Sequence, residues 1–136
     1  MKKCILLAVL ILSTSALADT WLPAIFGDNM VLQRETNVTI WGEDAPDTDV
    51  TVSFAGQNAT AKADADGKWS VALKPMKAGT IGDLVIKGSS EHSMTNIIVG
   101  DVWICSGQSN MQWSLGQASN ALAEMKAADY PQIRFF

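Results

Sequence analysis

The sequence predicts an α+β protein in two parts: an antiparallel β-sandwich over residues 19–99, followed by the start of an α/β domain over residues 100–136. Two observations carry this prediction. Short apolar runs with period-two alternation fill the first part and are separated by Gly, Asn and Asp, a pattern typical of a small sandwich. The second part reads as strand, turn, helix and strand, which is how a parallel α/β unit begins.

The first 18 residues predict a secretory signal peptide. Lys2 and Lys3 form a basic start, residues 4–12 form an apolar core that is too short to span a bilayer, and the small residues of a cleavage site end at Ala18. We therefore expect a mature chain that begins at Asp19, has no membrane span after cleavage, and is secreted or periplasmic.

Composition and charge argue against several kinds of partner and cofactor. Without Lys2 and Lys3 the chain keeps eight basic residues against 14 acidic ones, a net charge of −6. This charge argues against a nucleic-acid partner. Cys105 would be the only cysteine of the mature chain and His92 is its only histidine, so we expect no disulfide framework, no metal site and no cofactor.

Alternating runs define the predicted strands of the first part. Residues 50–54 and 68–73 alternate apolar with polar side chains, as half-buried strands do. Residues 64–67, Asp-Ala-Asp-Gly, lie between two runs and predict a hairpin turn. A calcium loop built on the same aspartates is excluded, because Lys62 and Leu73 would occupy its first and last ligand positions.

The second part opens on an apolar run at residues 102–105, which predicts a buried strand. Residues of about 117–128 place apolar side chains at helical spacing, and Pro131 ends that helix. Residues 133–136 predict a further strand and carry no turn signal after them. We therefore expect the chain to be the amino-terminal part of a longer protein.

Ser109 is the candidate catalytic residue, because it follows the carboxyl end of the predicted strand, where catalytic groups of α/β sheets gather. Gly107 would let the chain turn sharply, and Gln108 and Asn110 would support the turn and an oxyanion site. The alternative is that Ser109 only caps a turn or a helix. The sequence does not match Gly-x-Ser-x-Gly, the usual motif around the nucleophile of serine hydrolases, because Met111 replaces its second glycine.

Four other side chains near this turn have structural interpretations. We expect His92, in a polar turn, to be solvated rather than to act as a catalytic base. We expect Cys105 to pack as a small apolar residue and Trp103 to join the core. For Trp113 the sequence leaves two interpretations open, a place in the core or a place in the lining of a sugar pocket.

Residues 100–113, GDVWICSGQSNMQW, strongly resemble the nucleophile segment of the sialate O-acetylesterases, which are carbohydrate acetylesterases of the SGNH-hydrolase superfamily. Residues 22–34, LPAIFGDNMVLQR, resemble the amino-terminal β-domain signature of that family. Residues 130–136, YPQIRFF, resemble the second strand of its hydrolase domain. The resemblance implies a flavodoxin-like hydrolase domain, truncated in this chain, with Ser109 as the catalytic serine.

The resemblance also implies a mechanism and a substrate. Ser109 would attack an acetyl ester of a sugar, either a sialic acid or a polysaccharide, and water would hydrolyse the acetyl-serine. The histidine and aspartate that activate the serine would lie beyond Phe136, together with two further oxyanion donors, so we expect residues 19–136 alone to be inactive.

Two alternatives to this interpretation remain open. One is a non-enzymatic carbohydrate-binding or adhesion β-sandwich, in which Ser109 is a plain turn residue. The other is an acetyl-xylan-type esterase of the same superfamily, which would act on acetylated plant polysaccharide.

Overall fold

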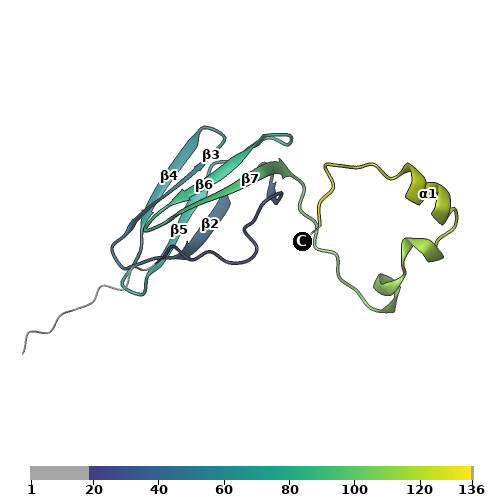
Figure 1. Ribbon diagram of the computed structural model, residues 1–136, viewed down its shortest axis with the longest axis horizontal. Coiled ribbons are helices and arrows are strands. Elements are labelled where there is room, and N and C mark those ends of the chain that lie inside the picture. The colour runs from purple at the N-terminus through teal and green to yellow at the C-terminus, as the bar shows by residue number, and fades with distance from the viewer. Residues whose placement is uncertain (1–18, 136) are drawn as a thin grey trace, which may run out of the picture.

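The computed structural model describes residues 19–135, so the predicted signal peptide and Phe136 lie outside the described residues. Within that range the chain forms a β-sheet part and a carboxyl-terminal segment that extends away from it (Figure 1). The elements are β1 (Val31–Gln33), β2 (Val38–Glu43), β3 (Asp49–Phe54), β4 (Gln57–Lys62), β5 (Lys68–Leu73), β6 (Ile81–Lys87), β7 (Glu91–Gly100), the 3-10 turns η1 (Ser109–Gln112) and η2 (Leu115–Gln117), and α1 (Ala121–Ala127).

The strands form two sheets, one of five strands in the order β1-β7-β6-β3-β4 and one that pairs β2 with β5. The prediction of a wholly antiparallel arrangement is wrong at one edge, because β1 runs parallel to β7, with Val31 opposite Ile98. Many residues separate these two strands in the sequence, so no tight turn forces them to be antiparallel. The sheet is therefore mixed.

Period-two alternation in the sequence agrees with burial in the structure. Along β5 the exposed and buried residues alternate without exception, and Trp69, Val71 and Leu73 point inward. Along β3 the buried residues are Val50, Val52 and Phe54. Side chains of both sheets meet in one apolar core. Complete burial of each such aliphatic side chain contributes about 1.5–3 kcal/mol.

The turn at residues 64–67 forms, but the hairpin predicted there does not. It joins β4 to β5, which belong to different sheets. Gly67 adopts a φ of 81°, and its backbone lies so close to Asp44 that a Cβ would be 2.5 Å from the Asp44 carbonyl oxygen. Turn residues specify a chain reversal but not which strands then pair, because pairing depends on which apolar faces must be buried.

The carboxyl-terminal segment, residues 101–135, is mostly irregular and departs from the predicted pattern. Helix α1 lies within the range predicted for a helix, but residues 102–105 and 133–135 are not strands. A strand needs a neighbouring strand to receive its backbone hydrogen bonds, and within residues 19–135 neither stretch pairs with another strand. The side chains of Ile104 and Phe135 are accordingly 95% and 96% exposed.

A polar network fixes the amino-terminal end of the described chain. Thr20 and Asp44 are both buried, and the Thr20 hydroxyl donates to Asp44 Oδ2 at 2.7 Å. The backbone amides of Ala45 and Ser89 and the Ser89 hydroxyl also donate to this carboxylate. Burial alone would raise the pKa of Asp44, but the bonds from Ser89, Thr20 and Ala45 outweigh it and lower the pKa to about 2.

No helix within residues 19–135 combines the length and the hydropathy needed to cross a membrane.

This network predicts a specific dependence of stability on pH. The pKa of Asp44 is about 2 in the folded chain and near 4 in the unfolded chain, so its stabilising effect is complete above pH 4 and is lost as the pH falls toward 2. We expect Asp44→Asn to unfold more easily than wild type at pH 7. The difference in unfolding free energy between wild type and Asp44→Asn should narrow by about 2 kcal/mol as the pH falls from 4 to 2.

Urea unfolding at a series of pH values measures this difference. Asp66→Asn is the matched control, because Asp66 is exposed and its side chain makes no hydrogen bond within residues 19–135. A difference in unfolding free energy between wild type and Asp44→Asn that stays constant with pH would contradict the low pKa of Asp44 in the folded chain.

Candidate functional site

The segment that carries Ser109 leaves the sheet at the end of β7. Arg34, just beyond β1, holds its first residue, because Arg34 Nε lies 2.8 Å from Asp101 Oδ1. The next residue is held as well, since the Val102 amide donates to Gln33 Oε1 at 2.9 Å. The chain is thus fixed at its exit from the β1/β7 edge, and the following residues enter solvent.

Ser109 is the first residue of η1, and it lies on a tight turn. The Met111 amide donates to the Gln108 carbonyl at 2.9 Å, and the Trp113 amide donates to the Asn110 carbonyl at 3.2 Å. Gln108 therefore occupies the N-cap position, although its side chain makes no capping bond. Gln108 and Asn110 support the turn through their backbone carbonyls.

The hydroxyl of Ser109 is available for chemistry. The residue is exposed, and within residues 19–135 its side chain has no hydrogen-bonding partner. A capping serine would instead accept a bond from a backbone amide of the following turn. The arrangement leaves Ser109 Oγ free to meet a substrate.

Gly107, expected to let the chain turn sharply without a Cβ clash, has a steric reason to be a glycine. Its φ is not in the left-handed region, which the described glycines Gly56, Gly67 and Gly79 adopt. Instead, a Cβ at Gly107 would lie 2.6 Å from Met111 Cγ. The missing side chain makes room for Met111, which folds back over the turn, and this contact could not be predicted from the sequence.

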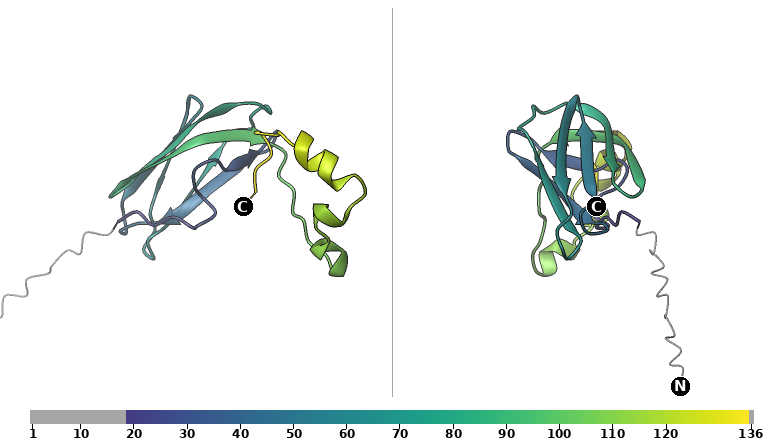
Figure 2. Two further views of the ribbon diagram at one scale, coloured as in Figure 1. Left: turned by 45° about the vertical axis from the view of Figure 1, so that its right-hand side comes forward. Right: turned by 90° about the vertical axis from the view of Figure 1, so that its left-hand side faces the viewer.

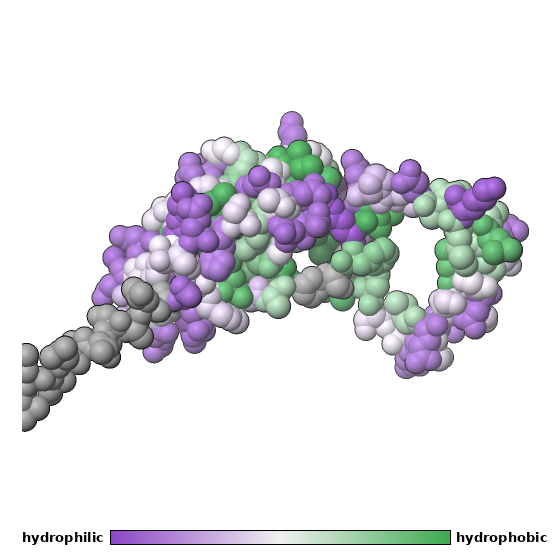
Figure 3. All heavy atoms as spheres, viewed as in Figure 1, coloured by the Kyte–Doolittle hydropathy of each residue, from purple (hydrophilic) through white to green (hydrophobic). Residues whose placement is uncertain are grey.

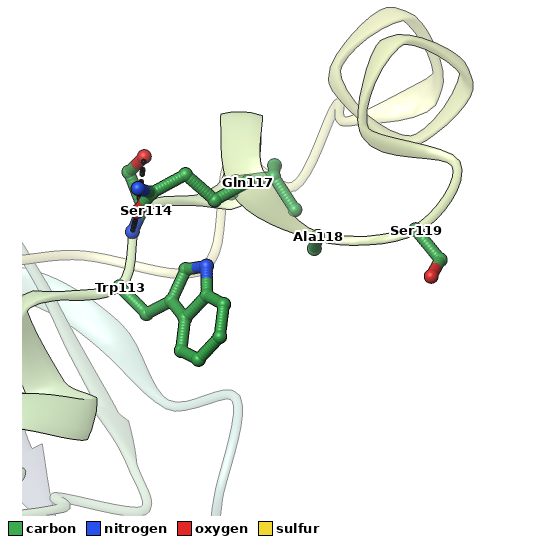
Figure 4. A pocket seen from close by; sticks show the side chains of 6 residues that line it. Trp113, Ser114, Gln117, Ala118 and Ser119 are labelled. Carbon is green, nitrogen blue, oxygen red and sulfur yellow. Dashed lines mark hydrogen bonds between the residues drawn. The ribbon is translucent and has the colours of Figure 1, made fainter.

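Ser109 borders an open depression of about 360 Å³ that is also lined by Gln112, Trp113 and Gln117. A second depression shares Trp113 and Gln117 and extends along η2 to Ser119 (Figure 4). Gln117 is held in place, because its Oε1 accepts a bond from the Ser114 amide at 3.1 Å. The exposed indole of Trp113 therefore lies beside the serine rather than in the core.

Gln112 and Gln117 were not predicted as site residues. Neither glutamine lies in the Gly-Gln-Ser-Asn motif of residues 107–110, so the sequence carried little signal for them. The one available signal was the pair Ser114 and Gln117, three residues apart, which matches a capping box.

His92 is placed at the opposite end of β7 from the exit toward Ser109. It lies eight residues before Gly100, which corresponds to about 26 Å of strand. Its Nε2 lies 2.7 Å from the Thr20 carbonyl oxygen and 3.3 Å from Ser90 Oγ. His92 therefore belongs to the polar network at the amino-terminal end and does not reach Ser109.

Two residues that were expected to pack are exposed within residues 19–135. Trp103, expected in the core, is 82% exposed, and Cys105, expected to pack, is an exposed thiol. Both belong to residues 102–105, where the predicted strand is absent. Without neighbouring strands no sheet forms, and apolar side chains of that segment have nothing in residues 19–135 to pack against.

No group of three or more His, Cys, Asp or Glu side chains lies close enough together in the described part of the chain to hold a metal ion.

A substitution at Gly107 tests the contact with Met111. We expect Gly107→Ala to displace Met111 and to break the bond from its amide to the Gln108 carbonyl, so that the Met111 amide exchanges with solvent about tenfold faster. The unfolding free energy should change by less than about 1 kcal/mol, because the turn is exposed.

Hydrogen exchange followed by NMR measures both effects. Gly116→Ala is the matched control, since a Cβ there meets its nearest neighbour, Met125, at an ordinary 3.6 Å. Equal exchange at Met111 in Gly107→Ala and in the wild type would rule out the steric account.

Comparison with known proteins finds relatives of one kind. Sialate O-acetylesterase from Mus musculus is 36% identical over 127 residues, which cover 83% of this chain and 24% of that protein. The enzyme of the same name from Homo sapiens is 36% identical over 121 residues, 79% of this chain and 23% of that protein. By their names these relatives are carboxylic ester hydrolases.

A solved structure agrees with the sequence relatives. A carbohydrate acetylesterase from Xanthomonas citri superposes with a TM-score of 0.78 at 40% identity, and the match covers 84% of this chain and 26% of that one. No family model matches the chain. The chain spans about a quarter of the length of the proteins that it matches. Over most of its own length, the chain is therefore related to the sialate O-acetylesterases.

Proposed function

We propose that the chain is part of a serine esterase that removes O-acetyl groups from carbohydrate, of the sialate O-acetylesterase type. The observation that carries this proposal is the exposed Ser109 hydroxyl, held on a tight turn and free of structural bonds within residues 19–135. The similarity to named acetylesterases over about 80% of the chain supports the reaction class.

The proposed reaction is acyl transfer in two steps. Ser109 Oγ attacks the carbonyl carbon of the acetyl ester while a base takes its proton, and the resulting oxyanion collapses to acetyl-serine with release of the sugar alcohol. Water then attacks the acetyl-serine, which releases acetate and restores the hydroxyl. Acyl transfer by this route requires no metal or cofactor.

Ser109 supplies the nucleophile and one donor for the oxyanion, its own backbone amide, which has no acceptor in the described structure. Within residues 19–135 Ser109 has no histidine beside it to act as a base, because His92 lies at the opposite end of β7 from the exit toward Ser109. We propose that a histidine, with an aspartate that orients it, and two further oxyanion donors come from additional chain.

The exposed apolar side chains of residues 101–135 support the idea of additional chain. Figure 3 shows hydrophobic surface spread over this segment. Soluble proteins rarely leave so many large apolar groups uncovered in one segment. The exposed groups are Val102, Trp103, Ile104, Met111, Trp113, Leu115, Leu122, Met125, Tyr130, Ile133 and Phe135.

We propose that these side chains, other than Trp113, enter the core of an α/β hydrolase domain of the flavodoxin-like SGNH type, which begins at residue 100. Residues 102–105 and 133–136 would then become strands by pairing with segments outside this chain. The amino-terminal unit, residues 19–99, would be a β-sandwich beside that domain. The five-stranded and two-stranded sheets that share one core support this description.

The substrate proposed is an O-acetylated sugar, either a sialic acid or a polysaccharide. Trp113 favours a sugar, because an exposed indole beside the nucleophile offers an apolar face to a pyranose ring. An acetyl-xylan-type polysaccharide is the second candidate. The Xanthomonas citri relative is named only as a carbohydrate acetylesterase, which agrees with either substrate.

We also propose that the protein is exported and that its signal peptide is cleaved after Ala18. The basic start and the short apolar core of residues 1–18 support this, although they lie outside the described residues. The intact mass of the exported protein should correspond to a chain that starts at Asp19. A retained Met1 would contradict cleavage.

Substitution of Ser109 tests the proposed function. In the complete protein we expect Ser109→Ala to lower kcat/KM for an acetyl ester by about 10³-fold or more, because the nucleophile is lost. Residues 19–136 alone should show no serine-dependent turnover. Hydrolysis of 4-nitrophenyl acetate and of an O-acetylated sugar measures both.

Ser119→Ala is the matched control, because Ser119 is an exposed serine of the same segment that lines only the second depression. It should retain nearly full activity. Equal turnover by wild type and Ser109→Ala would remove Ser109 from the mechanism and favour the carbohydrate-binding module.

A further inference from the structure

Arg134 attaches the far end of the carboxyl-terminal segment to the β-sheet part. Its Nη1 donates to the carbonyl oxygens of Asn29 at 3.0 Å and Met30 at 3.3 Å, and also to the carbonyl of Asn96. Its Nη2 donates to Asn96 Oδ1 at 3.3 Å. Figure 2 shows the yellow end of the chain returning to the end of the sheet from which the green segment departs.

An irregularity in the sheet makes one of the three carbonyls, that of Asn96, available to Arg134. The pairing of β6 with β7 shifts register between Gly82 and Leu84, and Asn96 lies in the resulting bulge of β7 with a φ of 56°. Asn29 also has a positive φ, of 64°. Bulges redirect backbone groups out of the ladder, which is how the Asn96 carbonyl becomes available to Arg134.

Side chains hold these two backbone positions in place. Asn96 Nδ2 donates to Asn29 Oδ1 at 2.7 Å, so the two residues are tied to each other. The amide of Thr95 donates to Asp28 Oδ1 at 2.6 Å, and the amide of Asn96 donates to Asp83 Oδ1 at 3.1 Å. The acceptor site is thus built by the β-sheet part itself, whereas Arg134 comes from the distant segment.

The segment is consequently attached at both ends to the same sheet edge. Arg34 and Asp101 fix its start, and Arg134 fixes its end. Attachment at both ends restricts the segment between them, which includes the turn with Ser109, far more than attachment at one end would.

We propose that Arg134 is a positioning residue, which sets the placement of the Ser109-bearing unit against the β-sheet part through the carbonyls of Asn29, Met30 and Asn96. The proposal rests on the proposed function for its effect on catalysis. A guanidinium suits this role, because its planar fork directs several donors at fixed acceptors, whereas a lysine offers one compact ammonium.

The test compares Arg134→Gln and Arg134→Lys with wild type in the complete protein. Lys126→Gln is the matched control, because it removes one positive charge from the same segment at an exposed residue that makes no hydrogen bond or ion pair within residues 19–135. Hydrogen exchange by mass spectrometry reports docking without reference to activity. We expect Arg134→Gln to speed exchange about tenfold in peptides that cover residues 27–30 and 94–97, and Lys126→Gln to leave it unchanged.

Kinetics with an acetyl ester then separates positioning from stability. Well below the unfolding temperature we expect Arg134→Gln to lower kcat about tenfold at nearly constant KM, since small displacements of a nucleophile affect the chemical step. Arg134→Lys should recover part of that loss. Unchanged exchange in Arg134→Gln overturns the docking role, and faster exchange with wild-type kcat overturns the positioning role.

The same experiment distinguishes failure of this inference from failure of the proposed function. If the complete protein shows no Ser109-dependent turnover, the proposed function fails and the positioning role fails with it. The exchange measurement still decides whether Arg134 docks the segment.

Discussion

The parallel pairing of β1 with β7 is the interaction on which the rest of the arrangement depends. It places the end of β1, with Gln33 and Arg34, beside the point where the chain leaves β7. At this edge Arg34 forms an ion pair with Asp101, and the backbone carbonyls of the residues just before β1 accept hydrogen bonds from Arg134. Within residues 19–135, every hydrogen bond between the Ser109-bearing segment and the β-sheet part is therefore made at or beside this one strand pair.

Burial differs sharply between the β-sheet part and the rest of the described chain. The two sheets bury their apolar side chains against each other in one core. Residues 101–135 instead present tryptophan, isoleucine and phenylalanine to solvent, and within residues 19–135 the only histidine, His92, lies at the opposite end of β7 from the exit toward Ser109. Hydrophobic burial and acid–base chemistry therefore support the same proposal, that further protein surrounds the Ser109 turn.

The sequence predicted local features well and long-range pairing poorly. Alternation along residues 68–73 identified the inward side chains of β5, because period two is a property of a single strand. The turn at residues 64–67 was found, but its strands pair with other partners, since pairing depends on the whole core. Residues 102–105 looked like a buried strand from composition alone, and composition does not report whether neighbouring strands are present.

The candidate site divides in the same way. Ser109 and Gly107 were predicted from the motif and stay predictions as site residues, and the structure adds that Gly107 accommodates Met111. Gln117 is held by a local contact with Ser114, whereas the contribution of Arg134 depends on contacts that the sequence does not encode locally. The Arg134 site in particular brings Arg134 into contact with residues about 40 and 100 positions earlier in the chain. It depends on a bulge in β7 that no short sequence motif predicts.

The most direct test of the central claim is covalent labelling of the complete protein with a fluorophosphonate, which reacts with activated serine nucleophiles. The account predicts a single adduct, mapped by mass spectrometry to Ser109, that forms in step with loss of acetyl-ester hydrolysis. An adduct on a different serine, or continued hydrolysis by fully labelled protein, would contradict the claim that Ser109 is the nucleophile.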